Sequence, residues 1–109
     1  MRKLFCIAVM ALLALSSCSS DKRPEVFIEE SQMIDILTDA YRLEARLNLM
    51  KSAGGDVSDR QVDFYNQLFE HYGITDTIFE ENMNYYTHHP SILERMMDSV
   101  NNRFIKANN

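Results

Sequence analysis

The sequence predicts an all-α protein: a small four-helix domain behind a cleaved lipoprotein signal and a short tether. Two observations support this fold class. Apolar residues recur at helical spacing in four segments, and glycine or proline separates the segments from one another. No stretch shows the apolar–polar alternation of a half-buried strand. We therefore divide the chain into a signal over residues 1–17, a lipidated cysteine with its tether over residues 18–30, and a helical domain over residues 31–107.

The N-terminus is typical of a bacterial lipoprotein signal. Arg2 and Lys3 precede an apolar run that is too short for a comfortable membrane span, and Leu15-Ser16-Ser17-Cys18 follows as a lipobox. We expect cleavage before Cys18 and attachment to membrane lipid through acyl chains on its thiol. The alternatives are an uncleaved anchor helix and an ordinary secretory signal with a chance cysteine.

Processing at this site limits the chemistry of the mature chain. Cleavage would remove 17 of the 109 residues and leave 92, enough for one small domain. Cys6 would leave with the signal and Cys18 would carry lipid, which excludes disulfides, thiolate catalysis and cysteine metal sites. Losing Arg2 and Lys3 from 11 basic residues leaves nine against 16 acidic ones, a formal charge of −7. That charge disfavours nucleic acid as a partner.

The tether leads into the first helix. Its residues are small and charged as far as Pro24, and the apolar triplet Val26-Phe27-Ile28 follows. The triplet either covers one end of the domain or packs just before the helix. We predict Ser31 as the N-cap of a helix over Gln32–Met50. Its expected apolar stripe is Met33, Ile34, Leu37, Ala40, Tyr41 and Leu47, and its expected solvated, ion-paired face is Asp35, Asp39, Arg42 and Arg46.

The second helix follows the break at Gly54 and Gly55. Ser58 and Gln61 have the spacing of a capping box, and the helix is expected to end near Tyr72 because Gly73 suits a left-handed stop that Ile74 can close. Its expected core stripe is Val62, Tyr65, Leu68, Phe69 and Tyr72.

The last two helices are separated by His88-His89-Pro90. Thr75 is the predicted N-cap of the third helix, whose buried side is Phe79, Met83 and Tyr86. Pro90 suits the first turn of the fourth helix. The stripe of this helix is Ile92, Leu93, Met96, Met97, Val100 and Phe104, and Asn108 and Asn109 follow it.

Two groups of residues are candidates for a site. Glu44 and Asn48 project close to the middle of the first helix's apolar stripe. A buried carboxylate there needs a partner, and the candidates are a tyrosine hydroxyl, His71 or Arg103. We interpret Glu44 as a group that orders the bundle; end exposure and a functional pocket remain alternatives.

The second group is Glu81, Tyr85 and His88, which share one face of the third helix at about 100° per residue. They offer an acid–base cluster or part of a zinc site. The competing interpretation is an exposed polar face followed by a turn. No metal-ligand spacing supports the zinc site, so we expect no metal, no cofactor and no catalytic residue.

Several motifs together resemble a known family. They are the lipobox, Ile34-Asp35-Ile36-Leu37-Thr38-Asp39, Tyr72-Gly73-Ile74-Thr75, and Tyr85-Tyr86 running into Pro90. Over roughly Pro24 to Phe104 the chain resembles the bacterial lipoprotein family called domain of unknown function 4296. Glu44-Ala45 is also similar to the family pattern, whereas His88-His89 is not. The resemblance implies a small helical envelope lipoprotein and brings no reaction with it.

The predicted function is that of a lipid-anchored, non-catalytic accessory or protein-interaction module. The chain has no G-x-S-x-G motif and no glycine-rich phosphate loop. The alternatives are a chaperone-like module, which should expose Met96, Met97 or Phe104, and a small-ligand or metal-binding lipoprotein. Because Ser19 follows Cys18, we expect the periplasmic face of the outer membrane, with the cell surface as the alternative, and another envelope protein as partner.

Overall fold

The computed structural model describes residues 2–7 and 22–107. The lipobox, Cys18, Asn108 and Asn109 lie outside the described residues. Residues 2–7 are helical, and four further helices follow: α2 (Glu30–Ser52), α3 (Ser58–His71), α4 (Asp76–Thr87) and α5 (Pro90–Ala107). Over the described ranges the chain is helical with no strand, which confirms the all-α prediction. None of the helices described is both long enough and apolar enough to cross a membrane.

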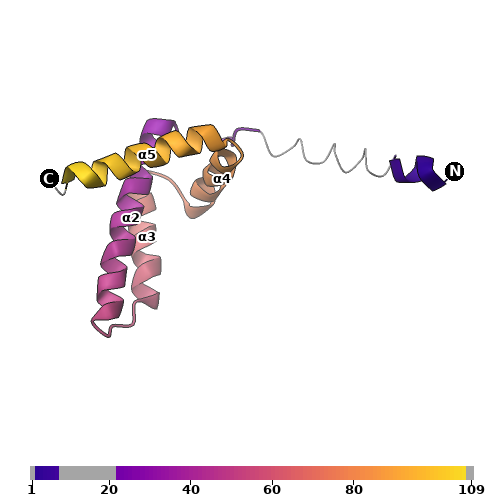
Figure 1. Cartoon of the computed structure of the whole chain (residues 1–109). Coiled ribbons are helices and arrows are strands. Elements are labelled where there is room, and N and C mark those ends of the chain that lie inside the picture. Colours follow the sequence, from indigo (N-terminus) through magenta and orange to yellow (C-terminus); the bar gives the residue numbers. More distant parts are fainter. Residues whose placement is uncertain (1, 8–21, 108–109) are drawn as a thin grey trace.

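The helices are arranged around a corner and do not form a compact parallel bundle. Helix α5 crosses the N-terminal half of α2, α4 lies under the first half of α5, and the antiparallel α2–α3 hairpin projects away from them (Figure 1). The hydrophobic core lies where these elements meet. It consists of Ile28, Met33, Ile36, Leu37, Tyr85, Tyr86, Met96 and Val100.

This crossing changes which residues of α2 are buried. Ile36 is buried although the predicted stripe omitted it, and Tyr41, which the stripe included, is 48% exposed. A helix that crosses another at a steep angle covers a short patch of its partner and not a stripe along its whole length. The apolar side chains of α2 beyond this patch are therefore buried only where α3 reaches them, as at Leu47.

The two serine caps predicted from the sequence are wrong. Helix α2 begins at Glu30 with Glu29 as its N-cap, so Ser31 already lies inside the first turn. Helix α3 begins at Ser58 with Val57 as its N-cap and has no capping box. In place of the box, the Asp56 carboxylate accepts hydrogen bonds from the Ser58 N–H (3.1 Å) and the Ser58 hydroxyl (2.8 Å). Through these two hydrogen bonds the Asp56 side chain, one residue before the N-cap Val57, fixes the backbone at the start of α3.

The burial of α3 also differs from its predicted stripe. Val62 is 61% exposed, while Phe69 and Val57 are buried. The stop at the end of α3 is confirmed. Gly73 has a φ of 68°, and the Ile74 N–H donates to the carbonyl of Phe69 at 2.9 Å. A left-handed glycine followed by an apolar residue is a common helix ending.

The start signals of the last two helices are also confirmed. The Thr75 hydroxyl accepts a hydrogen bond from the Ile78 N–H at 3.2 Å, as an N-cap should. Pro90 is the first residue of α5, where its missing N–H costs nothing. On the predicted α5 stripe Met96 and Val100 are buried, and the remaining members pack half-buried against the core.

Candidate functional site

The apolar triplet of residues 26–28, which we call the strap, is hydrogen-bonded into the helical domain. The Asn82 side chain of α4 is 0% exposed and makes three hydrogen bonds of 2.8 Å. Its Oδ1 accepts from the Ile28 N–H, and its Nδ2 donates to the carbonyls of Val26 and Ile78. The strap therefore belongs to the domain, although the sequence-based division placed it in the tether.

Tyr86 provides a second attachment for the strap. Its hydroxyl donates to the Ile28 carbonyl at 2.5 Å, and burial raises the pKa of Tyr86 to about 12. Together Asn82 and Tyr86 satisfy both backbone polar groups of Ile28, which is itself in the core. A buried backbone needs such partners, and here α4 supplies them in place of a neighbouring strand.

Tyr85 contacts both the strap and Arg23, which lies just before the strap. Its ring meets Phe27 edge to face at 5.3 Å between centroids, and the Arg23 guanidinium lies 4.6 Å from the centre of the Phe27 ring. A hydrogen bond with Tyr85 raises the pKa of Arg23. These side chains line a hollow of about 320 Å³ together with Glu29 and Glu30.

The three residues predicted as a site on α4 differ in their exposure to solvent. Glu81 and His88 are exposed, whereas Tyr85 is 7% exposed, so the expectation that they share an open face is wrong for Tyr85. The reason is that the strap covers this side of α4. Within the described ranges no group of three or more His, Cys, Asp or Glu side chains is placed to hold a metal ion.

The adjacent histidines contribute to the end of α4. His88 Nδ1 donates to the Asn84 carbonyl at 2.7 Å, and His89 Nδ1 donates to the Tyr85 carbonyl at 2.8 Å. Because a carbonyl only accepts, the Nδ1 of each ring carries the proton. The two rings thus add second donors to carbonyls in the last turn of α4, because the Asn84 carbonyl also accepts from the Thr87 hydroxyl and the Tyr85 carbonyl from the His88 N–H.

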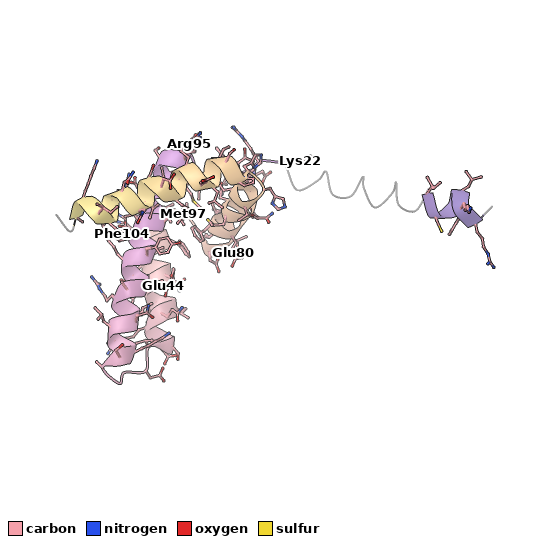
Figure 2. All side chains as sticks on the ribbon, in the orientation of Figure 1. Lys22, Glu44, Glu80, Arg95, Met97 and Phe104 are labelled. Atoms are coloured by element: carbon pink, nitrogen blue, oxygen red, sulfur yellow. The ribbon has the colours of Figure 1, made fainter. Side chains whose placement is uncertain are left out.

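Glu44 lies about halfway along the α2–α3 hairpin (Figure 2), half-buried, and accepts a hydrogen bond from the Tyr65 hydroxyl of α3. Burial and this hydrogen bond raise the pKa of Tyr65 to about 12. A tyrosine hydroxyl was one of the expected partner types. Asn48 is exposed, contrary to its expected place in the apolar stripe, and its backbone carbonyl accepts a hydrogen bond from the Ser52 hydroxyl at 3.0 Å.

We expect Glu44→Ala to lower the free energy of unfolding by about 1 kcal/mol, since it leaves the half-buried Tyr65 hydroxyl without its acceptor. Glu44→Gln keeps an acceptor oxygen and should lose less. Thermal unfolding of both variants measures the effect, and Tyr65→Phe serves as the reciprocal control. If Glu44→Ala and Glu44→Gln both unfold at the wild-type temperature, Glu44 does not order the hairpin.

Tyrosine ionisation predicts how stability depends on alkaline pH. Tyr72 donates to the Asp39 carboxylate, and burial together with this hydrogen bond raises the pKa of Tyr72 to about 12. Burial is also the main cause that raises the pKa of Tyr65 and the pKa of Tyr86 to about 12. The unfolded value is near 10, so the folded state favours the protonated phenols. Their contribution is complete below about pH 10 and is lost as the pH rises to about 12. Denaturant melts across this range should show the decline, and a level profile would contradict it.

A groove runs along the α2–α3 hairpin toward the end of α5. It consists of two adjoining hollows of about 390 and 400 Å³ that share Asp39 and Arg42. The hollow along the hairpin is lined by Asp39, Arg42, Leu43, Arg46, Phe64, Gln67, Leu68 and His71. The hollow beside α5 is lined by Asp35, Thr38, Asp39, Arg42, Tyr72, Arg103 and Lys106. We call the whole surface the hairpin groove.

Ion pairs organise the hairpin groove. Arg42 pairs with Asp39 at 3.3 Å, and Arg103 of α5 pairs with Asp35 of α2. The sequence indicated an ion-paired face on α2, which these pairs confirm for Asp35, Asp39 and Arg42. It did not indicate Arg103 or Lys106 as parts of the same surface. The only sequence feature that could have indicated Arg103 and Lys106 was their place on the polar face of α5, opposite its apolar stripe.

The chain matches a known family model. A family model described as "Domain of unknown function (DUF4296)" matches residues 24–109. No curated protein and no solved structure matches the chain. The match begins at Pro24, just before the strap, so the matched region includes both the strap and all four helices of the domain.

Proposed function

Because the chain belongs to the DUF4296 family, whose description names no activity, we propose a function from its own residues. We propose that it is a lipid-anchored, non-catalytic interaction module of the bacterial cell envelope. Cys18 is the lipidated residue in this proposal. The partner is another envelope protein, and the domain is held beside the membrane to meet it.

The strap is the observation that supports the proposal most. Because Asn82 and Tyr86 hold residues 26–28 against α4, the folded domain begins at the strap. Only residues 19–25 then separate Cys18 from the domain, a spacer that extended backbone limits to about 25–30 Å. A domain confined to this distance meets other envelope proteins at a high effective concentration, so modest contacts suffice for binding.

The proposed location follows from the spacer sequence. Ser19, not aspartate, follows Cys18, and Asp21 is followed by Lys22 and Arg23 with no acidic run. We place the module on the periplasmic face of the outer membrane. Protease treatment of intact cells tests this location: the domain should survive, and its removal would establish display at the cell surface.

Burial of the α5 methionines bears on the chaperone-like alternative. Met96 is 0% exposed, while Met97 and Phe104 are half-buried along the part of α5 that crosses and passes α2 (Figure 2). A client-binding surface at these positions would have only the two half-buried side chains to offer. The hairpin groove, with its mixture of charged and apolar lining, better suits a defined partner.

Crosslinking in cells tests the proposal. The native lipoprotein and a Cys18→Ala version, which cannot be acylated, are each crosslinked and purified. We expect a discrete envelope protein to be captured by the anchored form and to be lost or strongly reduced with Cys18→Ala. Equal capture by both forms would show that the anchor has no role in partner choice. Capture of many unrelated proteins would support a chaperone in place of an accessory module.

A further inference from the structure

We propose that the hairpin groove binds an acidic amphipathic segment of the partner protein, an inference that rests on the proposed function above. The groove has two features that such a segment would match. One is an apolar floor, and the other is a rim with more positive than negative side chains. Both are present in an otherwise acidic chain.

The floor of the groove is formed by Leu43 of α2 and by Phe64 and Leu68 of α3. All three are half-buried, so the hairpin leaves part of each side chain in contact with solvent. Covering this apolar surface would favour binding by about 25 cal/mol for each Å² removed from water. An occupant therefore needs apolar side chains on the face that meets the floor.

The rim of the groove carries a net positive charge, although the protein as a whole is acidic. Four cations line the groove, Arg42, Arg46, Arg103 and Lys106, against two carboxylates, Asp35 and Asp39, whereas the whole chain carries −5. The two carboxylates are already engaged by Arg42 and Arg103. Across residues 22–107 no carboxylate lies within ion-pair distance of Arg46 or Lys106. These two positive charges remain available to an acidic partner.

The spacing of the cations favours a polypeptide over a small anion. Arg42 and Arg46 are four residues apart on α2, about 6 Å along its axis, and Lys106 lies at the other end of the groove on α5. A single phosphate or carboxylate cannot reach both ends. A helix with Asp or Glu at the same spacing and apolar residues between them presents its charges to the rim and its apolar side to the floor.

Binding of a defined probe tests the proposal on the full lipidated protein in detergent. The probe is a fluorescent model helix with Leu on one face and Glu on the other, and the matched control replaces Glu with Lys. We expect the Glu helix to bind at least about tenfold more tightly, a difference of about 1.4 kcal/mol. Arg46→Glu should weaken it by about tenfold, and Arg60→Glu, an exposed change on α3 outside the groove, should not. Equal binding of the two helices, or no effect of Arg46→Glu, would overturn the proposal.

Phosphatidylglycerol vesicles provide the competing occupant in the same assay. Vesicle binding that is lost with Arg46→Glu, in the absence of Glu-helix binding, would assign the groove to lipid and overturn the proposal. Failure to bind both the Glu helix and the vesicles would overturn it as well.

Photocrosslinking in cells separates this inference from the proposed function. A photoreactive residue replaces Gln67, which lines the groove and is exposed, or the neighbouring Asn66, which is exposed outside it. Capture from Gln67 at a mapped acidic amphipathic segment, lost with Arg46→Glu, would support the inference. Capture from Asn66 alone would overturn it and leave the proposed function standing. Capture from neither position, with no partner in the Cys18-dependent pull-down, would overturn both.

Discussion

Replacing Asn82 with alanine should lower the free energy of unfolding by about 3 kcal/mol. The side chain is fully buried and satisfies the Ile28 N–H and the Val26 carbonyl, two groups of a segment more than 50 residues away in the chain. Alanine would leave these groups without partners and would also create a cavity, and each effect alone costs about 1–3 kcal/mol. Urea denaturation of the purified protein gives the value directly.

Two controls show whether the loss arises from the strap. Asn84→Ala, an exposed change on the same helix, should leave stability within about 0.5 kcal/mol of wild type. Tyr86→Phe removes only the hydroxyl that donates to the Ile28 carbonyl and should cost about 1–2 kcal/mol. If Asn82→Ala were no more destabilising than Asn84→Ala, the strap would not be a structural part of the domain.

The second large effect is expected at Met96, where alanine should cost about 3 kcal/mol. Met96 is fully buried in the core where α5 crosses α2, and truncation of a buried methionine removes both its transfer energy and its packing contacts. Met97, the adjacent half-buried residue, is the matched control, and its replacement by alanine should cost less than half as much. Thermal or urea unfolding of the two variants compares them.

The four helices of the domain were predictable from the sequence because their signals are local. Apolar spacing, the glycine at Gly73, the cap at Thr75 and the proline at Pro90 each act within a few residues. The serine caps failed for an equally local reason. A serine before an apolar run resembles a cap, but at the start of α3 the Ser58 hydroxyl donates to the Asp56 carboxylate and caps no N–H of the helix.

Contacts between distant segments were not predictable. Tyr86 was predicted on the buried side of α4, but the burial of Tyr85 was not, because it results from contact with the strap. Asn82 gave no signal either, because a polar residue on a helix is ordinarily solvated, and its partners lie more than 50 residues away. The groove likewise depends on Arg103, which pairs with an aspartate 68 residues away in the chain. Glu44 lies half-buried against Tyr65, a partner that the sequence could indicate only by residue type.

Lipidation of Cys18 is the claim on which the rest of the proposed function depends. Cells expressing the native chain or Cys18→Ala are labelled with an alkyne analogue of palmitate, and membrane and soluble fractions are compared. We expect a labelled native protein in the membrane fraction and an unlabelled Cys18→Ala protein released from it. A native protein that carries no label, or a Cys18→Ala protein that keeps both its label and its membrane association, would contradict lipidation at Cys18.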